Sequence, residues 1–288
     1  MSVIIPAYRA AATIGRAVRS ADAQSPPPRE IIVIDDGSGD GTLEAARAAA
    51  GAAGNAPVTV LTQENQGAGA ARNRGLAEAR GAFVAFLDAD DEWLPGKLAH
   101  SLPPFDDPAC VLVAHDFLRA GADGGGETRV DCHRHFAAPG DPYVRLYERG
   151  FLATSTVVAR RQAVVDVGGF DTGLRTAQDF DLWLRLLAPP AARFHLFAAA
   201  LTRYHVTPGS ITSFTRRRLD CCLVIARRHV PALRRRGGGV LGPLWFRVLA
   251  VHYEAMAAYA AAGALPRAAL TALALPLALA RETLAARP

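Results

Sequence analysis

The chain has few of the features that mark secreted, disulfide-bonded or membrane-spanning proteins. It has only four cysteines in 288 residues and no C-x-x-C pair, which favours reduced structural thiols over a disulfide framework. Met1 leads directly into an apolar segment, so no signal peptide is expected. No uninterrupted apolar stretch has membrane-spanning length, because the longest, residues 268–280, is short and contains Pro276. We therefore expect a cytoplasmic protein.

Lysine is almost absent, and the positive charge is carried by arginine and is unevenly placed. Lys97 is the single lysine, and the formal charge is +5. Residues 211–288 have a net charge of +9, whereas residues 1–210 have −4. No zinc-finger or RNA-binding signature accompanies the arginines, so we expect no nucleic-acid partner. Peripheral docking on an anionic membrane at its inner face is one expectation for the basic region, and a solvated face or a homodimer contact is the other.

Short apolar segments alternate with helical stretches over the first hundred residues. This alternation predicts an α/β fold with a mostly parallel sheet flanked by helices, because strands buried on both faces are uniformly apolar. Beyond residue 214 the chain is helical, alanine-rich and basic, and residues 237–239 are three glycines that interrupt it. The expected strands are residues 2–5, 31–34, 58–61, 82–87, 111–114, 155–159 and 193–201, the main expected helices are residues 13–23, 67–80 and 180–187, and residues 120–142 are expected to be a loop.

Polar clusters follow three of the expected strands. They are Pro6-Ala7-Tyr8, Asp35-Asp36-Gly37-Ser38 and Asp88-Ala89-Asp90-Asp91. Carboxyl ends of parallel strands meet at one edge of the sheet, which is where ligands bind in open α/β folds. Closely spaced carboxylates favour a hard divalent cation that also binds phosphate oxygens. This pattern points to a metal-bridged diphosphate, with an ordinary solvated turn as the alternative.

Other phosphate and metal signatures are incomplete. The segment Gly67-Ala68-Gly69-Ala70-Ala71-Arg72 lacks the third glycine of a dinucleotide-binding motif and follows the third strand, not the first. The segment Cys132-His133-Arg134-His135 lacks the second ligand pair of a zinc site. Neither motif defines a site by itself.

Taken in order, the motifs resemble the family 2 glycosyltransferases, which are inverting enzymes with the GT-A (Rossmann-like) fold. The segments that carry the resemblance are Ser2 to Tyr8, Asp35-Asp36-Gly37-Ser38, Asn65-x-Gly67 with Ala71-Arg72-Asn73-x-Gly75, Phe86 to Asp91, Gly168-Gly169-Phe170-Asp171, Gln178 to Arg185, and Tyr204 to Thr212. The resemblance implies a transferase domain over residues 1–215, with a donor half (1–105) and an acceptor half (106–215). Residues 216–288 would be a helical, basic extension.

The resemblance also implies roles on the donor side, where a nucleotide diphosphate sugar, most commonly a UDP-sugar, would bind. Asp90 would bind Mn²⁺ or Mg²⁺, which stabilises the departing diphosphate, and Asp91 is a second candidate ligand. Arg72 would reach the base or the diphosphate, unless it is only a surface charge. The implied donor-nucleotide residues are Pro6, Ala7, Tyr8, Asp35, Asp36, Asn65, Gly67, Arg72, Asp88 and Ala89.

On the acceptor side the resemblance implies a general base that deprotonates the acceptor hydroxyl. The family has a Glu-Asp pair there, and this chain has Gln178-Asp179, which makes Asp179 the expected base and Gln178 an acceptor contact. Asp181 is expected to be a helix surface charge or an early-turn acid. Trp183 is either a core residue or a platform that stacks on the acceptor sugar. His205 stands where many relatives have arginine, and it is either a metal ligand or structural.

The expected function is metal-assisted, inverting transfer of a sugar to a hydroxyl of a saccharide or glycolipid acceptor. A sugar-nucleotide pyrophosphorylase is disfavoured, because its glycine- and arginine-rich first loop with a following lysine is missing. A non-catalytic, sugar-nucleotide-binding or scaffolding relative is the remaining alternative. The retained acids Asp36, Asp88, Asp90 and Asp179 argue against it.

Overall fold

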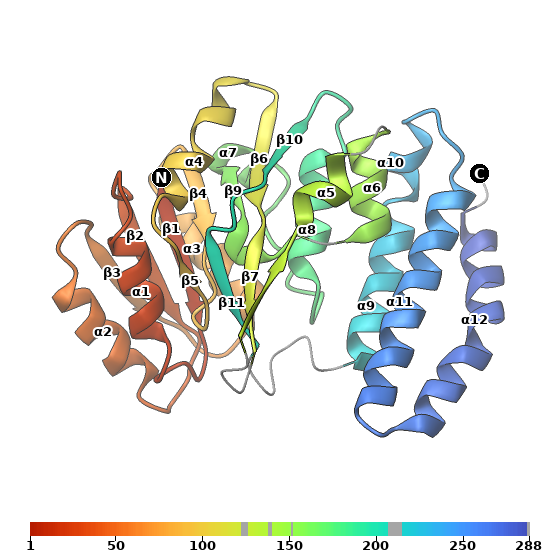
Figure 1. The fold of residues 1–288 in the computed structure, drawn as a ribbon, viewed down its shortest axis with the longest axis horizontal. Coiled ribbons are helices and arrows are strands. Elements are labelled where there is room, and N and C mark those ends of the chain that lie inside the picture. The colour runs from red at the N-terminus through yellow and green to blue at the C-terminus, as the bar shows by residue number, and fades with distance from the viewer. Residues whose placement is uncertain (122–125, 138–139, 151, 207–214, 287–288) are drawn as a thin grey trace.

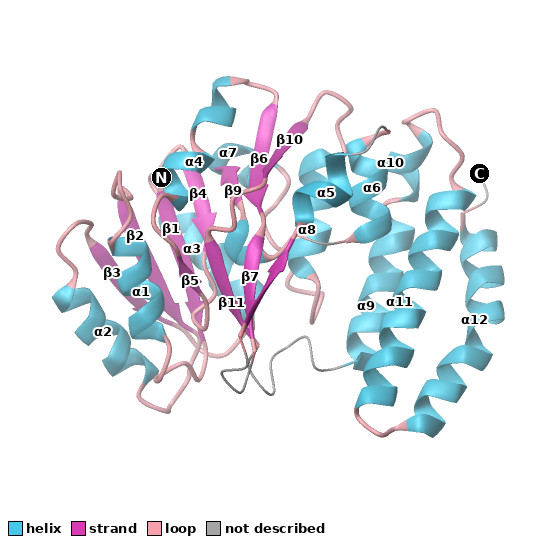
Figure 2. Ribbon diagram, in the orientation of Figure 1, coloured by secondary structure: helices cyan, strands magenta, loops and turns pink. Residues whose placement is uncertain are grey.

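A computed structural model of the chain describes residues 1–121, 126–137, 140–150, 152–206 and 215–286. A large β-sheet with helices on both faces forms one side of the molecule, and long helices form the other (Figures 1 and 2). The closing-loop motif at residues 208–212 lies outside the described residues. The α/β class and the helical C-terminal extension that the sequence predicts are both confirmed.

The main sheet has seven strands in the order β10-β6-β9-β4-β1-β2-β3. All neighbouring strands are parallel except β9, which runs antiparallel to β4 and β6. The strands are β1 (Ser2–Ala7), β2 (Glu30–Asp35), β3 (Val58–Thr62), β4 (Phe83–Phe86), β6 (Cys110–His115), β9 (Val158–Arg160) and β10 (Arg193–Phe197). The expected mostly parallel sheet is confirmed.

Successive side chains of the central strands enter two different cores, one on each face of the sheet. Val3 and Ile5 of β1 pack with the buried residues of α1 (Ile14–Asp22) and α2 (Thr42–Ala52). Ile4, between them, packs with α3 (Ala68–Glu78) and α8 (Gln178–Leu187) on the opposite face. This alternation follows from the two-residue period of a strand. Burial on both faces explains why the strands are uniformly apolar.

A second sheet, which the sequence analysis did not predict, has the order β5-β11-β7-β8. Its strands are β5 (Glu92–Trp93), β7 (Phe117–Ala120), β8 (Glu127–Val130) and β11 (Thr202–His205). The expected loop at residues 120–142 is therefore wrong in part, since it contains β8 and the helix α5 (Cys132–Ala137). The expected strand at residues 193–201 is also too long: β10 ends at Phe197 and β11 begins at Thr202.

The C-terminal helices pack against α8 and leave one apolar face exposed. Buried residues of α9, α10 and α11 share a core with α8. The final helix is 21 residues long and apolar enough by length and composition to cross a membrane, yet only 11% of its most apolar window is buried. Pro276 lies inside this helix without ending it, so the prediction that no segment here is long and apolar enough to span a membrane is wrong by length and composition. The remaining helices are α4 (Lys97–Ser101), α6 (Pro142–Arg149), α7 (Arg161–Asp166), α9 (Thr215–Arg228), α10 (Val230–Arg234), α11 (Leu241–Ala261) and α12 (Leu265–Ala285).

Candidate active site

The three polar clusters converge at the carboxyl ends of β1, β2 and β4. These strands are direct neighbours in the sheet, and Ala7 of β1 is in register with Asp35 of β2. The backbone N–H of Asp36 donates to the carbonyl of Ala7 over 2.8 Å. Tyr8 follows Ala7 and is 47% exposed, whereas Pro6 and Ala7 are buried in the strand. The convergence predicted from the sequence is present, and Tyr8 is the accessible member of its cluster.

The Asp36 carboxylate organises the loop that leads into α3. Its Oδ1 accepts hydrogen bonds from the Gln63 side chain (2.8 Å) and the Gln66 backbone (2.9 Å), and its Oδ2 accepts from the Gly67 backbone (2.8 Å). The Asn65 side chain donates to the Asp36 carbonyl over 3.0 Å. Since each carboxylate oxygen has about two lone-pair sites, the buried Asp36 retains acceptor capacity for a ligand. Three residues expected on the donor side, Asp36, Asn65 and Gly67, therefore form one hydrogen-bonded unit.

Asp35 anchors the following loop. Its Oδ1 accepts from the Ser38 hydroxyl, which in turn accepts from the Arg9 backbone N–H over 3.0 Å. Gly37 in this loop has φ +69°, and a Cβ there would lie 2.9 Å from the backbone nitrogen of Asn65. Glycine is required at this point, because both the positive φ and the close approach exclude a side chain. The loops after β2 and β3 are thereby held together.

Arg72 lies in the site and not on the surface, which excludes the alternative of a surface charge. Its guanidinium is 2.6 Å from Asp88 Oδ1, and the side chain is only 9% exposed. The guanidinium also lies over the Phe170 ring, 5.3 Å from its centroid. Arg72 therefore partly neutralises the acidic turn and links the helix α3 to the end of β4.

Asp91 is an anchor inside the protein. Its side chain is fully buried, with Oδ2 accepting from the Ser155 hydroxyl (2.5 Å) and Oδ1 from the His205 backbone (3.0 Å). Burial, followed by the neighbouring charges of Asp88 and Asp90, raises the pKa of Asp91 well above its usual range. Because its side chain is fully buried, the structure does not favour Asp91 as the second metal ligand that the sequence left open.

Asp90 and His205 have the properties of metal ligands. Asp90 is half-buried at the end of β4. The His205 Nε2 atom is buried and has no hydrogen-bond partner among the described residues. Burial, and then the charges of Arg16 and Arg203, lower the pKa of His205, which keeps the imidazole neutral near pH 7. A carboxylate oxygen and a neutral imidazole nitrogen are both suitable ligands for Mn²⁺, so these residues fit the expected cation.

A second group of metal-type side chains lies next to the smaller sheet, and of its members the sequence analysis considered only His133. Ligand atoms of Asp116, Asp131 and His133 lie within 4.8 Å of one another. The Arg129 guanidinium already pairs with Asp116 (2.9 Å) and Asp131 (2.7 Å). Burial, then the charges of Asp116 and Asp131, raise the pKa of Cys132 to about 12, so its thiol is not a thiolate ligand at neutral pH. This group is best described as an ion-pair cluster with arginine as its cation.

Gln178 and Asp179 lie in the first turn of α8, facing the start of α3. The Gln178 side chain packs on Gly69, where an added Cβ would lie 3.0 Å from the Gln178 Cδ atom. The half-buried Asp179 carboxylate accepts from the Thr154 hydroxyl (2.7 Å) and from the Phe180 backbone (2.8 Å). Each oxygen accepts one bond, which leaves lone pairs for a proton. The acceptor-side residues thus lie against the donor-side helix.

Asp181 is a buried acid in the first turn of α8, so the early-turn alternative is confirmed and the surface-charge alternative is wrong. It is 0% exposed and contacts Arg185 (2.7 Å), Arg228 (3.0 Å) and His229 (3.2 Å). Burial alone would raise the pKa of Asp181, but the hydrogen bonds from His229 and Arg185 outweigh it and lower the pKa to about 2. Asp181 therefore stabilises the packing of α9 and α10 on α8 and does not face the site.

Trp183 belongs to the core, which corrects its assignment to the acceptor site. The side chain is 1% exposed, and its ring centroid lies 5.8 Å from that of Phe86 and 6.2 Å from that of Phe170. A sugar cannot stack on a ring that is enclosed by other aromatic rings. The core alternative that the sequence left open is confirmed.

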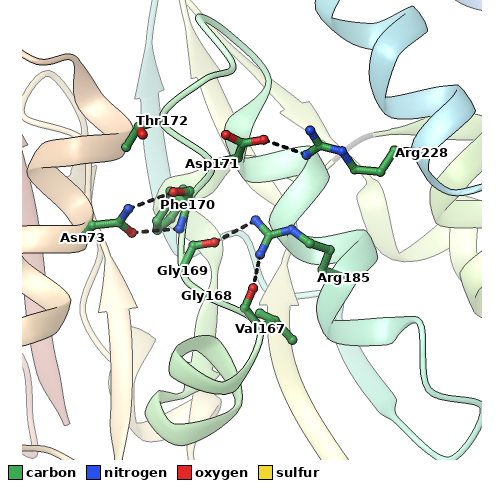
Figure 3. A pocket seen from close by; sticks show the side chains of 9 residues that line it. All are labelled: Asn73, Val167, Gly168, Gly169, Phe170, Asp171, Thr172, Arg185 and Arg228. Carbon is green, nitrogen blue, oxygen red and sulfur yellow. Dashed lines mark hydrogen bonds and ion pairs between the residues drawn. The ribbon is translucent and has the colours of Figure 1, made fainter.

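A hollow of about 540 Å³ lies along the Gly168–Thr172 turn (Figure 3). Asn73 of α3 exchanges two hydrogen bonds with the Phe170 backbone (2.7 and 2.8 Å). Arg185 donates to the carbonyls of Val167 and Gly169. None of the expected donor, metal or base residues lines this hollow. The turn joins α3 to α8, and the hollow beside it is not the expected active site.

Comparison with known proteins identifies the family. The model of glycosyl transferase family 2 matches residues 2–168, more than half of the chain. The chain belongs to glycosyl transferase family 2. It is 32% identical over 213 residues to the Bacillus subtilis protein TuaG, which is named for teichuronic acid biosynthesis, covering 74% of this chain and 81% of TuaG. It is 34% identical over 240 residues to the succinoglycan biosynthesis protein ExoU of Rhizobium meliloti, covering 75% and 66%.

Solved structures confirm the GT-A fold. The mannosyltransferase PcManGT of Pyrobaculum calidifontis, in complex with GDP-Man and Mn²⁺, aligns with a TM-score of 0.65 at 24% identity, covering 99% of this chain and 85% of that one. Residues 1–349 of S. aureus TarS, in complex with UDP-GlcNAc, align with a TM-score of 0.61 at 20% identity, covering 96% and 91%. At these identities the likeness shows the fold alone.

Proposed function

We propose that the protein is a metal-assisted, inverting glycosyltransferase that uses a nucleoside diphosphate sugar, with a UDP-sugar as the expected donor. Family membership supports glycosyl transfer. The nucleotide-sugar complexes of two proteins with the same fold support the donor class, one with UDP-GlcNAc and the other with GDP-Man. The observation that carries the proposal is the convergence of the acidic turn, Arg72 and the β2 and β3 loops at one edge of the sheet.

On the donor side, the exposed Tyr8 and the loop unit around Asp36 would hold the base and ribose, with Pro6, Ala7, Asp35 and Ala89 as their buried support. Asp88 and its partner Arg72 would hold the sugar and the diphosphate. Asp90 and His205 would hold Mn²⁺ or Mg²⁺, which supplies a Lewis acid for the departing diphosphate.

On the acceptor side, Asp179 would take the proton of the attacking hydroxyl. Inverting transfer needs a base on the face opposite the leaving diphosphate. Asp179 is half-buried, has free lone pairs, and lies in a different element from the acidic turn. Gln178 would bind the acceptor beside it.

The relatives are named for teichuronic acid and succinoglycan biosynthesis, which supports a saccharide or lipid-linked saccharide as the acceptor class. Such acceptors are commonly assembled at membranes, and the C-terminal helices support peripheral membrane docking here. Five leucines of α12 are between 59% and 77% exposed: Leu265, Leu270, Leu273, Leu277 and Leu284. Its exposed charged residues, Arg267 and Arg281, are both positive, as an anionic lipid surface requires.

Nucleotide binding tests whether the proposed donor site binds a nucleoside diphosphate sugar. We expect UDP or a UDP-sugar with Mn²⁺ to raise the melting temperature, because a ligand at 100 times its Kd adds about 2.7 kcal/mol, or roughly 5–10 °C for a domain of this size. GDP-sugars are the comparison arm, and chelation should abolish the shift. Asp90→Ala should lose the metal-dependent part, whereas Asp106→Ala, which removes an exposed acid elsewhere, should not.

Equal nucleotide affinity with Mn²⁺, with chelator and in Asp90→Ala would contradict the metal assignment. A shift with GDP-sugars alone would replace UDP by GDP. Normal metal-dependent binding without any release of nucleoside diphosphate from the sugar nucleotide would favour the non-catalytic alternative.

A further inference from the structure

Two consecutive hydroxyl residues lie between the acidic turn and the acceptor-side acid. Thr154 and Ser155 belong to the short 3-10 turn Thr154–Thr156, which precedes β9. Thr154 is 6% exposed and Ser155 is 1% exposed. The sequence analysis assigned them no role and expected a strand at residues 155–159, whereas Ser155 lies in this turn and the strand β9 begins at Val158.

Ser155 is fixed to the donor-side acidic turn. Its hydroxyl donates to Asp91 Oδ2 over 2.5 Å and accepts from the Asp88 backbone N–H over 3.0 Å. Its carbonyl accepts from the indole N–H of Trp93 over 2.8 Å. Because these three partners all follow β4, Ser155 cannot move without moving the turn that contains the expected metal ligand.

Thr154, in contrast, contacts the acid on α8. Its hydroxyl donates to Asp179 Oδ2 over 2.7 Å, across 25 residues of sequence. A hydrogen bond from a fixed donor occupies one lone pair and limits rotation of the carboxylate. With the Phe180 N–H on the second oxygen, the carboxylate has one defined orientation. The remaining lone pairs then point in fixed directions.

Thr156 on the same turn shows what an ordinary turn hydroxyl does. Its side chain donates to the carbonyl of Ala153 three residues earlier, over 2.7 Å, which is a local turn bond. Both threonines are buried and belong to the same element. Only Thr154 gives its hydroxyl to a partly accessible carboxylate, so its bond serves Asp179 and not the turn.

We propose that Thr154 is a positioning residue for Asp179, and that the Thr154–Ser155 pair fixes the placement of the acceptor-side base relative to the donor-side acidic turn. This inference rests on the proposed role of Asp179 as the base. Transfer requires the acceptor hydroxyl, the base and the anomeric carbon in one geometry, and displacements of about 1 Å can cost about 100-fold in rate. A rigid link of two adjacent residues between the two acids meets that requirement.

Matched variants of this turn test the inference. Turnover is measured as release of nucleoside diphosphate from the UDP- or GDP-sugar that gives the largest thermal shift with Mn²⁺. Thr154→Val removes the hydroxyl at nearly constant shape and should lower kcat by about 10- to 100-fold, with the donor KM unchanged. Thr154→Ser should restore most of the rate, and Thr156→Val should match wild type. Thr154→Ala replaces Thr154→Val if the latter does not fold.

Combination with Asp179→Asn separates this inference from the proposed function. If Thr154 acts through Asp179, the double variant Thr154→Val/Asp179→Asn should be no slower than Asp179→Asn alone, because residues that act as one unit are not additive. Wild-type turnover of Thr154→Val alongside an inactive Asp179→Asn would overturn the inference and leave the base in place. Wild-type turnover of Asp179→Asn would overturn the base assignment itself, and the inference with it.

Discussion

At the scale of single residues, the surrounding side chains determine what each acid near the site can do. Asp179 is half-buried and has two neutral donors, Thr154 and the Phe180 N–H. Asp181, two residues later on the same helix, is fully buried among three cationic or potentially cationic side chains. Side chains two residues apart in an α-helix point in directions that differ by about 200° around the helix axis. This rotation separates a group that can exchange a proton with a ligand from one that holds helices together.

Asp181→Asn should destabilise the protein without a direct effect on donor binding. The folded-state pKa of Asp181, about 2, is below its ordinary value of 3.8. The carboxylate therefore contributes stability above pH 4, by about 2 kcal/mol from the linkage relation, and this contribution is lost as the pH falls towards 2. The free energy of unfolding in urea at pH 7 should thus fall by at least about 2 kcal/mol.

Asp220→Asn is the matched control for this change. Asp220 is exposed and pairs with Arg216 one helical turn away, and such surface pairs contribute about 0.3–0.5 kcal/mol. Equal unfolding free energies for the two variants would show that the buried ion pairs do not stabilise the fold. The same conclusion would follow if the difference in unfolding free energy between the wild type and Asp181→Asn were the same at pH 5 and at pH 3.

At the scale of secondary structure, the helix α3 connects the site to the sheet through a close backbone contact. A Cβ on Gly75 would lie 2.6 Å from Ile4 Cγ2 and 2.8 Å from Ile34 Cδ1. Both isoleucines are fully buried in the central strands β1 and β2. The helix that contains Arg72 can therefore approach the sheet only because residue 75 has no side chain.

Gly75→Ala should destabilise the protein by about 1–3 kcal/mol through overpacking. Gly51→Ala is the control, since Gly51 also lies in a helix, α2, but has nothing within 4 Å of an added Cβ. There alanine should stabilise by about 0.5–1 kcal/mol through its helix propensity. Chemical denaturation of both variants measures the difference, and a stabilising effect at both positions would contradict the described packing of α3.

Periodicity predicted the long and continuously apolar elements well. The expected strand at residues 31–34 is β2 (Glu30–Asp35), and the expected helix at residues 67–80 is α3 (Ala68–Glu78). The second sheet could not be found in this way. β5 has two residues, and β8 is largely exposed and pairs with β7. Such strands are defined by their partners, not by their own apolar pattern, because short half-exposed segments have no distinctive periodicity.

Among the site residues, too, features of the local sequence were predictable, and features that depend on distant partners were not. The acids after β2 and β4 were predictable, because a polar cluster after an apolar strand is a local feature of sequence. The roles of Asp91 and Asp181 were not, since they depend on Ser155 and His229, which are 64 and 48 residues away. Trp183 was ambiguous because an aromatic residue at helical spacing fits either a core or a stacking surface. Only the packing against Phe86 decides between them.

At the scale of the whole molecule, the net positive charge and most of the exposed large apolar side chains belong to the C-terminal helices. Glu282 of α12 is buried and pairs with Arg227 of α9, so the exposed charged residues of α12 are Arg267 and Arg281. On the same helix Leu273 and Leu277 are 77% and 74% exposed. An apolar face with positive charges fits an anionic bilayer surface better than water.

The protein should therefore float with vesicles that contain anionic lipid, and less so with neutral vesicles or in high salt, since the Debye length falls to about 3 Å at 1 M. Replacing Leu273 and Leu277 by Gln should abolish flotation. Val165→Gln, which changes an exposed apolar residue on α7, should not. Equal recovery with neutral and anionic vesicles would contradict the membrane proposal, and a stable dimer that the leucine changes dissociate would assign this face to a second copy.

Turnover of Asp179→Asn decides whether this chain transfers sugar with Asp179 as the base. Asparagine keeps the shape and accepts the Thr154 hydrogen bond but cannot take a proton, so turnover should fall by about 10²–10⁴-fold. Nucleotide affinity in the presence of Mn²⁺, measured by calorimetry, should stay at the wild-type value, because the proposed role of Asp179 is to contact the acceptor and not the nucleotide. Near-normal turnover in Asp179→Asn, with binding intact, would contradict the account.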